Sequence, residues 1–376
     1  MYICRWGWVL KWNCVRIDKL KLINFRNYSK LDIEFNPYLN IIIGNNAQGK
    51  TNILEAIYYL SITKSFLILN DSVSVKNGEL FLKIVGNISN NKGKKKLEVI
   101  INENGKKLLI NDNEIKKHAS YIGNLKVIIF NPDNIRLIKD APGNRRKFLN
   151  VEISQLDNKY INNLNEYNIV LKQRNEYLKV IKNGKINQVY FDILNEKLID
   201  LAVYIYDGRI KFIQMITKYI TDIFKDISGY DGLMVNYLPS VDIDNIKKNM
   251  EDKLNNNYER EIIYGNTLYG PHRDDFSFKL LDDDLILYGS QGQLKMAILA
   301  LKLAEVKVFY EVCGEYPVLL LDDLFSELDV LKRNKVISYL NKDIQTVVTT
   351  TDLENIDSDF INKANVYKIE NGKICE

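Results

Sequence analysis

Apolar and polar residues alternate near the start of the chain in the way expected of half-buried strands. In the stretch KLKLINFRNYSKLDIEF, residues 19–35, the apolar Leu31, Ile33 and Phe35 are separated by acidic residues. One face of such an extended segment is apolar and the other is polar. A shorter run of the same kind precedes it, so we predict a hairpin that enters a sheet.

A continuously apolar run, LNIIIG at residues 39–44, follows the hairpin. Such runs are typical of strands that are buried on both faces. The next stretch, TNILEAIYYLSITKS at 51–65, places Ile53, Ile57 and Leu60 at helical spacing. The predicted order is therefore strand, glycine-containing loop, helix.

Residues 80–117 have the pattern of an antiparallel meander. Short apolar runs are separated by turn residues at Asn104-Gly105 and again near 111–113. The run KVIIF at 126–130 predicts one more strand.

Helical periodicity replaces the strand pattern between about residues 144 and 227. Apolar residues recur at three- and four-residue intervals in two series: Leu156, Tyr160, Leu164, Tyr167 and Leu171, then Leu194, Leu198, Leu201 and Ile205. No proline interrupts this region, and Gly184 and Gly208 are its predicted breaks.

Strand and helix patterns return near residue 260 and continue to a hairpin turn at Asn371-Gly372. Strands and helices at both ends of the chain, with helices between them, predict one α/β head assembled from both ends. The expected divisions are an extension at 1–16, the N-terminal part of the head at 17–143, a helical arm lobe at 144–255 and the C-terminal part of the head at 256–376.

Composition narrows the class of protein. The chain has 376 residues, of which 46% are hydrophobic, enough for one large domain or two. No apolar run reaches the roughly 18 residues of a membrane-spanning helix, so no membrane partner is expected. Four scattered cysteines and two histidines form no zinc-ligand pattern and indicate a reducing, cytoplasmic location. The net charge of +4 is mild, but basic residues cluster at 92–96, 106–107 and 145–147.

Gly44, Gly49, Lys50 and Thr51 match the pattern G-x-x-x-x-G-K-[ST]. The glycines let backbone N–H groups surround phosphates, the lysine neutralises the terminal phosphates, and the threonine hydroxyl ligates Mg²⁺. The helix that begins near Thr51 points its positive end at the same oxygens. The segment predicts nucleotide binding; a glycine-rich turn without function is the alternative.

A pair of aspartates ends the apolar run PVLLLDD. A P-loop requires a second carboxylate on the metal side at the end of a neighbouring strand, and Asp322 is suited to hold magnesium through water. Asp323 is expected to orient the attacking water. The alternative is a chance pair of aspartates at a strand end.

The segment YGSQGQ, residues 288–293, opens an amphipathic helix with Ser290 and Gly292 at its start. In ABC-type ATPases a serine-glycine-glutamine turn of this form lies on the γ-phosphate held by a second subunit, again at a helix N-terminus. The site is then complete only in a dimer. Residues 326–329 (SELD) resemble the D-loop of the same seam.

Together these motifs resemble the RecF family, which is related to the SMC and Rad50 heads. The resemblance runs from about residue 17 to the C-terminus. It rests on KLKLINFRNY, GNNAQGKTNILEAIYYLS, KSF, FNPDNIRLIKDAPGNRRKFLN, GPHRDD, GSQGQ and LLLDDLFSELD, in the family's order. The chain departs from the family pattern at Leu67 and at Leu294-Lys295.

The resemblance implies an α/β fold with a P-loop ABC/SMC-type ATPase head and an inserted helical arm lobe. It also implies an ATP-dependent homodimer with ATP and Mg²⁺ as cofactors and weak, slow hydrolysis. DNA with gaps or single-strand/duplex junctions, RecR and RecO are the implied partners, in recombinational gap repair, the SOS response and replication restart.

Site residues are assigned by the same resemblance. The nucleotide contacts are Arg26, Gly44, Asn45, Asn46, Ala47, Gln48, Gly49, Lys50, Thr51, Asn52, Ser290, Gly292 and Gln293. The catalytic candidates are Lys50, Ser290, Asp322 and Asp323, and the metal ligands are Thr51 and Asp322.

Phosphate contacts with DNA require basic side chains in a row. Arg145, Arg146 and Lys147 are the first candidates; a structural role for the two arginines, pairing with acids between arm and head, is the alternative. His272 and Arg273 in GPHRDD are expected to serve the nucleotide, the DNA or the fold itself.

Two other classes of protein share part of this pattern. The ATPase subunit of an ABC-type transporter has the P-loop, the serine turn and the acidic strand, but no histidine follows Thr349–Thr351 here. A structural clamp of the SMC/Rad50 type requires coiled coils far longer than this arm.

Overall fold

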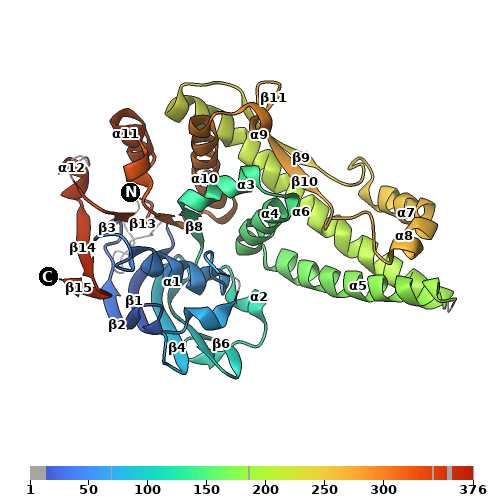
Figure 1. Ribbon diagram of the computed structural model, residues 1–376, viewed down its shortest axis with the longest axis horizontal. Coiled ribbons are helices and arrows are strands. Elements are labelled where there is room, and N and C mark those ends of the chain that lie inside the picture. Colours follow the sequence, from blue (N-terminus) through green and yellow to red (C-terminus); the bar gives the residue numbers. More distant parts are fainter. Residues whose placement is uncertain (1–13, 69, 185–186, 341–342, 354–357, 376) are drawn as a thin grey trace, which may run out of the picture. The chain divides into compact units, whose positions relative to one another are not determined.

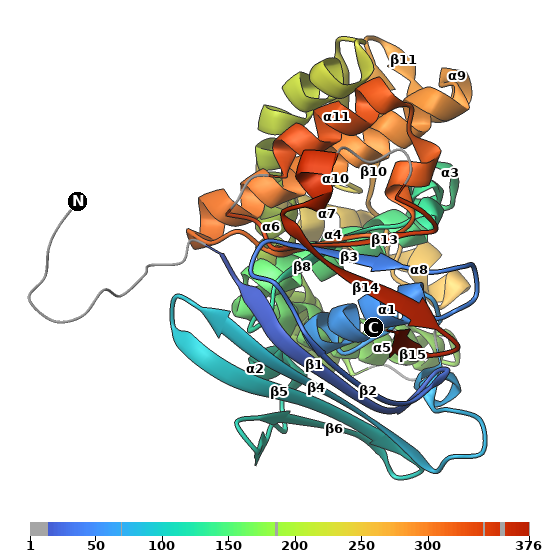
Figure 2. The same ribbon diagram turned by 90° about the vertical axis from the view of Figure 1, so that its left-hand side faces the viewer.

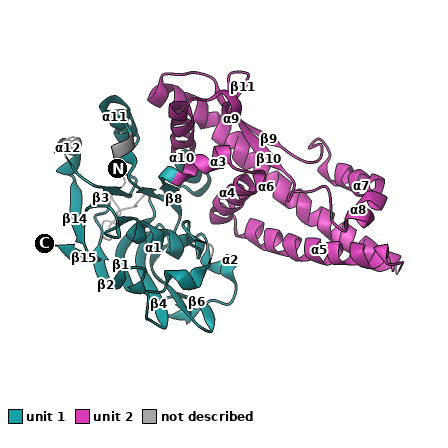
Figure 3. Ribbon diagram, viewed as in Figure 1, with its two compact units in different colours: residues 1–132, 305–376 teal, residues 133–304 magenta. Residues whose placement is uncertain are grey.

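The computed structural model describes residues 14–68, 70–184, 187–340, 343–353 and 358–375. The chain divides into two compact units (Figure 3): unit 1 comprises Met1–Pro132 and Glu305–Glu376, and unit 2 comprises Asp133–Ala304. Both ends of the chain therefore build unit 1, as predicted. Most of the expected extension at 1–16 lies outside the described residues.

An antiparallel sheet forms one layer of unit 1 (Figure 1), with strand order β2-β1-β4-β5-β6-β7. The predicted hairpin over 19–35 is the β1/β2 pair, and the predicted turns near 104 and 111 connect β5 to β6 and β6 to β7. The strands are β1 (Arg16–Phe25), β2 (Tyr28–Glu34), β4 (Phe81–Asn90), β5 (Gly93–Asn102), β6 (Gly105–Ile110) and β7 (Asn113–Glu114).

The second sheet of unit 1 has the order β15-β14-β3-β13-β12-β8. All neighbouring strands are parallel except β14 and β15, which form the hairpin predicted at Asn371-Gly372. The carboxyl ends of the parallel strands meet at one edge, where ligands bind in open α/β sheets. The strands are β3 (Leu39–Ile43), β8 (Val127–Phe130), β12 (Val318–Leu321), β13 (Thr346–Thr350), β14 (Ala364–Glu370) and β15 (Lys373–Cys375).

Helix α1 (Lys50–Ile62) lies between the two sheets (Figure 2), against β4 and β5 of the first and β8 and β13 of the second. It is buried on nearly every side, which explains why its sequence is apolar around most of its circumference. The shorter helices of this unit are η1 (Asp71–Ser74), α2 (His118–Tyr121), η3 (Leu324–Glu327), α11 (Val330–Tyr339) and α12 (Ser358–Ile361).

Unit 2 is a helical lobe with a small sheet of order β11-β10-β9. Two long antiparallel neighbours, α5 (Asn158–Lys182) and α6 (Gln188–Ser228), form its main helix pair. Its other elements are α3 (Arg136–Lys139), α4 (Pro142–Leu156), β9 (Leu233–Leu238), α7 (Ile246–Asn256), α8 (Tyr258–Tyr264), β10 (Asp275–Leu280), β11 (Asp283–Asp284) and α9 (Leu285–Tyr288). Two further elements cross the limits of the unit. The helix α10 (Gln291–Cys313) ends in unit 1, and η2 (Pro132–Ile135) begins there.

One of the two predicted helix breaks is wrong. Gly184 follows α5 in a left-handed turn, as expected, but Gly208 lies inside the continuous helix α6. A Cβ atom at residue 208 would come within 2.8 Å of the Tyr160 ring. The glycine therefore permits close packing of the ring on α6 and does not end the helix.

The predicted limits of the arm lobe, 144 and 255, also differ from the limits of unit 2. Strand β10, expected in the head, pairs along its whole length with β9, and the segment before α4 packs with the lobe. These long-range pairings extend the unit in both directions. Within the described part of the chain, every helix is too short or too polar to span a bilayer.

Candidate nucleotide site

The predicted phosphate loop follows β3 at the carboxyl edge of the parallel sheet, and two of its glycines are sterically required. Gly49 has φ 106°, and a Cβ atom there would lie 2.5 Å from Asn27 Nδ2. At Gly44 a Cβ atom would lie 2.4 Å from the carbonyl oxygen of Ile369. Ala47 also has a positive φ, of 64°. The side chains of residues 45–47 are exposed, which leaves their backbone open to a ligand.

Lys50 is the first residue of α1 and is only 4% exposed. Its Nζ donates to the carbonyl oxygens of Gly44, at 2.7 Å, and Asn45, at 3.1 Å. Both acceptors are neutral, and within the described residues no carboxylate forms an ion pair with the ammonium group, although its charge acts to lower the pKa of the Asp322 carboxyl. This is the arrangement needed to attract phosphate.

Thr51 and Asp322 meet across the carboxyl edge of the sheet. Thr51 Oγ1 donates to Asp322 Oδ1 at 3.0 Å, and Thr349 Oγ1 donates to the same oxygen at 2.7 Å. Burial raises the pKa of the Asp322 carboxyl, and the two hydroxyl donors act in the opposite direction. A hydroxyl and a carboxylate beside a phosphate loop are the hard oxygen ligands that Mg²⁺ prefers.

Asp323 adopts a left-handed conformation with φ 48°. Its backbone N–H donates to Thr349 Oγ1 at 3.0 Å. Thr349 thus contacts both predicted acidic residues, a role that sequence patterns did not reveal because threonine in a buried strand is common.

The turn between β1 and β2 supports the phosphate loop from one side. Asn27 Nδ2 donates to the carbonyl of Gln48 at 2.9 Å, while Asn27 Oδ1 accepts from Asn52 Nδ2 at 2.9 Å. Tyr28 donates to the carbonyl of Gly49 at 3.0 Å. Asn27 and Tyr28 belong to the stretch NFRNY, but nothing in the sequence indicates which loop they contact.

A second support comes from the β14/β15 hairpin. The backbone N–H of Asn371 donates to Gln48 Oε1 at 2.6 Å. Gln48 therefore joins the phosphate loop to a turn that the sequence predicted as a hairpin but did not connect with this site.

Arg26, a predicted nucleotide contact, forms a bidentate pair with Glu55 of α1. Its Nε and Nη2 donate to the two carboxylate oxygens at 2.8 and 2.5 Å. Glu55 is 0% exposed and also accepts from Ser65 Oγ at 2.5 Å. The pair fixes the β1/β2 turn to the helix that follows the phosphate loop, and a contact of Arg26 with nucleotide stays a prediction.

The predicted serine turn belongs to unit 2 and caps α10. Ser290 N donates to Gln293 Oε1 at 2.8 Å, and Gln293 N donates to Ser290 Oγ at 3.2 Å, which is a reciprocal capping box. Ser290, Gln291 and Gly292 are exposed. The positive end of a 23-residue helix is therefore presented to solvent at a serine and a glycine.

The predicted D-loop, residues 326–329, spans the end of η3 and the residue before α11. Asp329 caps α11, because its Oδ1 accepts from the backbone N–H of Lys332 at 2.9 Å.

The basic run 145–147 requires a correction. Arg145, a predicted DNA contact, is 5% exposed and forms a bidentate pair with Asp275 at 2.6 and 2.9 Å. Its Nη1 donates to three carbonyl oxygens of residues 137–140. Each of the three nitrogens of this guanidinium group thus donates to an acceptor inside unit 2, which supports the structural role.

The neighbours of Arg145 differ from it in exposure. Arg146 is partly buried and donates to the carbonyl of Asp274 at 2.8 Å, whereas Lys147 is exposed. In the 92–96 cluster, Lys92 and Lys94 are exposed, but Lys96 pairs with both Glu98 and Asp112.

The GPHRDD segment is held by polar contacts within unit 2. His272 bonds to Tyr167 Oη at 2.7 Å and to the carbonyl of Thr267 at 3.1 Å, and burial lowers its pKa to about 4. Arg273 donates to the same carbonyl at 3.0 Å. These contacts favour the structural interpretation of both residues.

Asp274, the next residue, accepts from Arg209 at 3.1 Å, from Tyr237, and from the backbone N–H of Ser240 at 2.8 Å. The segment is therefore the centre of a buried network.

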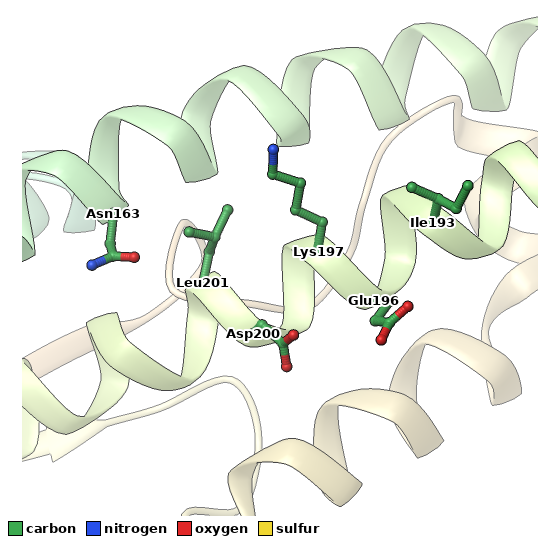
Figure 4. Close-up of a pocket in the computed structure, with 6 residues that line it drawn as sticks. All are labelled: Asn163, Ile193, Glu196, Lys197, Asp200 and Leu201. Atoms are coloured by element: carbon green, nitrogen blue, oxygen red, sulfur yellow. The ribbon is translucent and has the colours of Figure 1, made fainter.

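Unit 2 also has a pocket of about 320 Å³ between α5 and α6 (Figure 4). Lys197, whose side chain points from α6 towards α5, pairs with Glu166 at 2.6 Å, and Asp200 pairs with Lys247 at 2.9 Å. Among the described residues that line the pocket no cation is left unpaired. The phosphate loop is therefore the better candidate for a nucleotide site.

The fold and this site define a P-loop ATPase head of the ABC/SMC class that carries a helical lobe. The family model described as RecF/RecN/SMC N terminal domain matches residues 16–374. The chain is 40% identical to the "DNA replication and repair protein RecF" of Geobacillus sp. (strain WCH70), over 95% of this chain and 98% of that protein. The same name is given to a Listeria welshimeri relative that is also 40% identical, over 96% and 99%. The chain belongs to the RecF family.

Solved structures agree with this assignment. The recombination mediator protein RecF with ATP, in the RecFOR pathway, superimposes with a TM-score of 0.90 at 32% identity and covers 98% of this chain and 99% of that one. The Smc head domain of Pyrococcus furiosus, with a TM-score of 0.55 at 16% identity, shares the fold.

Proposed function

We propose that this chain is an ATP-dependent DNA-binding protein of recombinational repair that dimerises on ATP and hydrolyses it slowly. The single observation that carries the nucleotide part is the contact of Thr51 with Asp322, at 3.0 Å across 271 residues of sequence. Relatives of nearly the same length named for DNA replication and repair support the cellular role, in gap repair, the SOS response and replication restart. A transporter subunit or a structural clamp has no comparable support.

In the proposed nucleotide site, a few residues have distinct roles in binding ATP and in its hydrolysis. Lys50 and the backbone N–H groups of 45–52 neutralise and surround the phosphates. Thr51 and Asp322 would hold Mg²⁺, which supplies charge neutralisation at the terminal phosphates. Asp323 orients a water molecule for attack on the terminal phosphate.

The serine turn provides the proposed dimer contact. Ser290, Gly292 and Gln293 are placed at an exposed helix N-terminus, which is suited to a phosphate carried by a second copy of the chain. Hydrolysis would then require the homodimer, and ATP would act as the switch for association.

DNA is the proposed second partner, in the form of gapped duplex or single-strand/duplex junctions, with RecR and RecO as protein partners in the cytoplasm. Lys147, Lys92 and Lys94 are the exposed candidates for phosphate contacts. Contacts of this kind give binding that weakens steeply with salt and shows little sequence preference.

Sedimentation with and without Mg-ATP, in the presence of gapped duplex at two salt concentrations, tests these proposals. We expect a dimer only with ATP, and DNA association that decreases at high salt. Ser290→Arg is expected to retain ATP binding and remain a monomer, whereas Ser120→Arg, at another exposed serine, is expected to dimerise. An ATP-dependent dimer of Ser290→Arg would refute the shared site.

Lys147→Ala is expected to reduce the slope of log affinity against log salt by about one. An unchanged slope would remove Lys147 from the DNA surface.

A further inference from the structure

The strand that carries Thr349 lies between the two strands that carry the nucleotide motifs. In the parallel sheet, β13 pairs with β3 on one side and with β12 on the other. Leu321 pairs with Val348, so Thr349 lies level with Asp322, and Thr349 itself pairs with Ile42. The phosphate loop and the acidic pair are therefore separated by a strand whose carboxyl end presents a hydroxyl group to the acidic pair.

The hydroxyl of Thr349 is used in two directions. It donates to Asp322 Oδ1 at 2.7 Å and accepts from the backbone N–H of Asp323 at 3.0 Å. Thr349 is 0% exposed, so no water replaces either bond if the hydroxyl is removed.

The second bond acts on a backbone that is otherwise unfavourable. Asp323 has φ 48°, a conformation that is uncommon for residues with a Cβ atom. The bond from its N–H group to Thr349 holds this conformation and thereby sets the direction of the Asp323 side chain. Loss of the bond would leave the N–H group without this acceptor and allow the backbone to relax.

We propose that Thr349 is a positioning residue for ATP hydrolysis, which fixes Asp322 and Asp323 relative to Thr51 through one buried hydroxyl group. The inference rests on the proposed function, because it assigns a role within the same nucleotide site. Thr349 lies on β13, the strand between β3, which leads into the phosphate loop, and β12, which leads into the acidic pair.

Thr349→Val and Thr349→Ser separate the hydroxyl from the shape of the side chain. Valine keeps the volume and removes both hydrogen bonds, whereas serine keeps the hydroxyl. Thr346→Val is the matched control, because Thr346 is buried on the same strand and its hydroxyl, within the residues that the structure describes, makes only a long contact, 3.5 Å, with a backbone carbonyl.

Three measurements are needed on the full chain: single-turnover hydrolysis, the affinity for a fluorescent ATP analogue with Mg²⁺ and with EDTA, and the melting temperature. For Thr349→Val we expect hydrolysis to be slowed about 10- to 100-fold, the cost typical of removing a group that orients a metal ligand. The gain in affinity from Mg²⁺ should shrink, while the affinity in EDTA stays within about threefold of wild type. Thr349→Ser should restore most of the rate.

Several outcomes would overturn the proposal. Wild-type hydrolysis and an unchanged Mg²⁺ effect in Thr349→Val would do so, as would a Thr349→Ser variant that is as slow as Thr349→Val. If Thr349→Val does not fold, Thr349→Ala provides the same comparison. If wild type itself fails to bind or hydrolyse ATP, the proposed function fails, which is distinct from a wild-type enzyme that tolerates loss of the hydroxyl.

Discussion

The phosphate loop of unit 1 and the arginine network of unit 2 each bury a cation, but they satisfy it differently. Lys50 is 4% exposed and donates to two neutral carbonyl groups. Arg209 is 1% exposed and donates to the Asp274 carboxylate, to the carbonyl of Pro271 at 2.6 Å, and to Asn150 and Tyr160. Lys50 forms no ion pair with a carboxylate in the described part of the chain, whereas Arg209 is paired with Asp274.

The difference explains which conspicuous motifs carry chemistry. A buried cation without an anionic partner is costly, so the fold tolerates it where an anionic ligand supplies the missing charge. A cation paired with a carboxylate inside a protein has a structural role, and removal of one partner leaves the other charge uncompensated. Arg145 of NRRKFLN, paired with Asp275, and Asp274 of GPHRDD, paired with Arg209, belong to the second type, which was the structural alternative left open for both motifs.

The largest expected effect comes from removing Arg209 from its ion pair with Asp274 in unit 2. Arg209→Met should lower the free energy of unfolding by about 3–5 kcal/mol, because Asp274 is left buried without its cation. Urea unfolding followed by circular dichroism measures the change. Lys211→Met, an exposed position on the same helix, is the control; equal stability of the two variants would contradict the comparison.

Replacing the buried lysine of unit 1 should weaken ATP binding and leave the stability of the fold nearly unchanged. Lys50→Met is expected to weaken ATP binding by at least about 100-fold, since the phosphate charge is no longer neutralised, and to change stability by less than about 1 kcal/mol. Titration with a fluorescent ATP analogue provides the test, with the exposed Lys30→Met as control. Wild-type affinity in Lys50→Met would defeat the assignment of the site.

The pH dependence of stability sharpens the contrast further. The folded protein holds His272 with a pKa of about 4, below the value near 6.5 expected when it is unfolded. As the pH falls, His272 takes up its proton in the unfolded chain at a higher pH than in the folded protein. The contribution of neutral His272 to the free energy of unfolding is therefore lost between about pH 6.5 and about pH 4. Because the ring is partly exposed, we expect a loss of about 1–2 kcal/mol.

Unfolding in urea at several pH values measures this effect. His272→Gln should show a shallower decline than wild type over that range, while His118→Gln should follow wild type more closely. Parallel curves for wild type and His272→Gln would contradict a neutral, partly exposed histidine in the network.

The smallest effect is expected at the support of the phosphate loop. Asn27→Ala removes the hydrogen bonds to Gln48 and Asn52, and a net loss of about 1 kcal/mol corresponds to an ATP affinity reduced roughly fivefold. Asn77→Ala, at an exposed position in the same unit, is the control in the same binding titration. A loss as large as that of Lys50→Met would mean that Asn27 contacts the ligand itself.

Local patterns in the sequence predicted much of the head. The run before Gly44, the helical spacing after Thr51 and the Asn-Gly turns each depend on neighbouring residues, and the structure confirms the elements that they predict. The meeting of Thr51 and Asp322 was expected because a P-loop requires such a carboxylate.

Long-range pairings account for what was missed. The burial of Arg145 depends on Asp275, 130 residues away, so a basic run by itself could not reveal it. Gly208 resembles a helix break until the Tyr160 ring is placed against it. The limits of unit 2 depend on the pairing of β9 with β10, and the role of Thr349 depends on the order of strands in the sheet.

The order β3-β13-β12 has a consequence for biosynthesis. The ribosome synthesises the phosphate loop long before strands β12 and β13. Asp322, the acidic partner of Thr51, follows it by 271 residues. The contact of Thr51 with Asp322 therefore forms only after the acidic strand has been synthesised, because it is non-local. Retention of nucleotide by newly synthesised chains would therefore indicate that the ATPase head has folded.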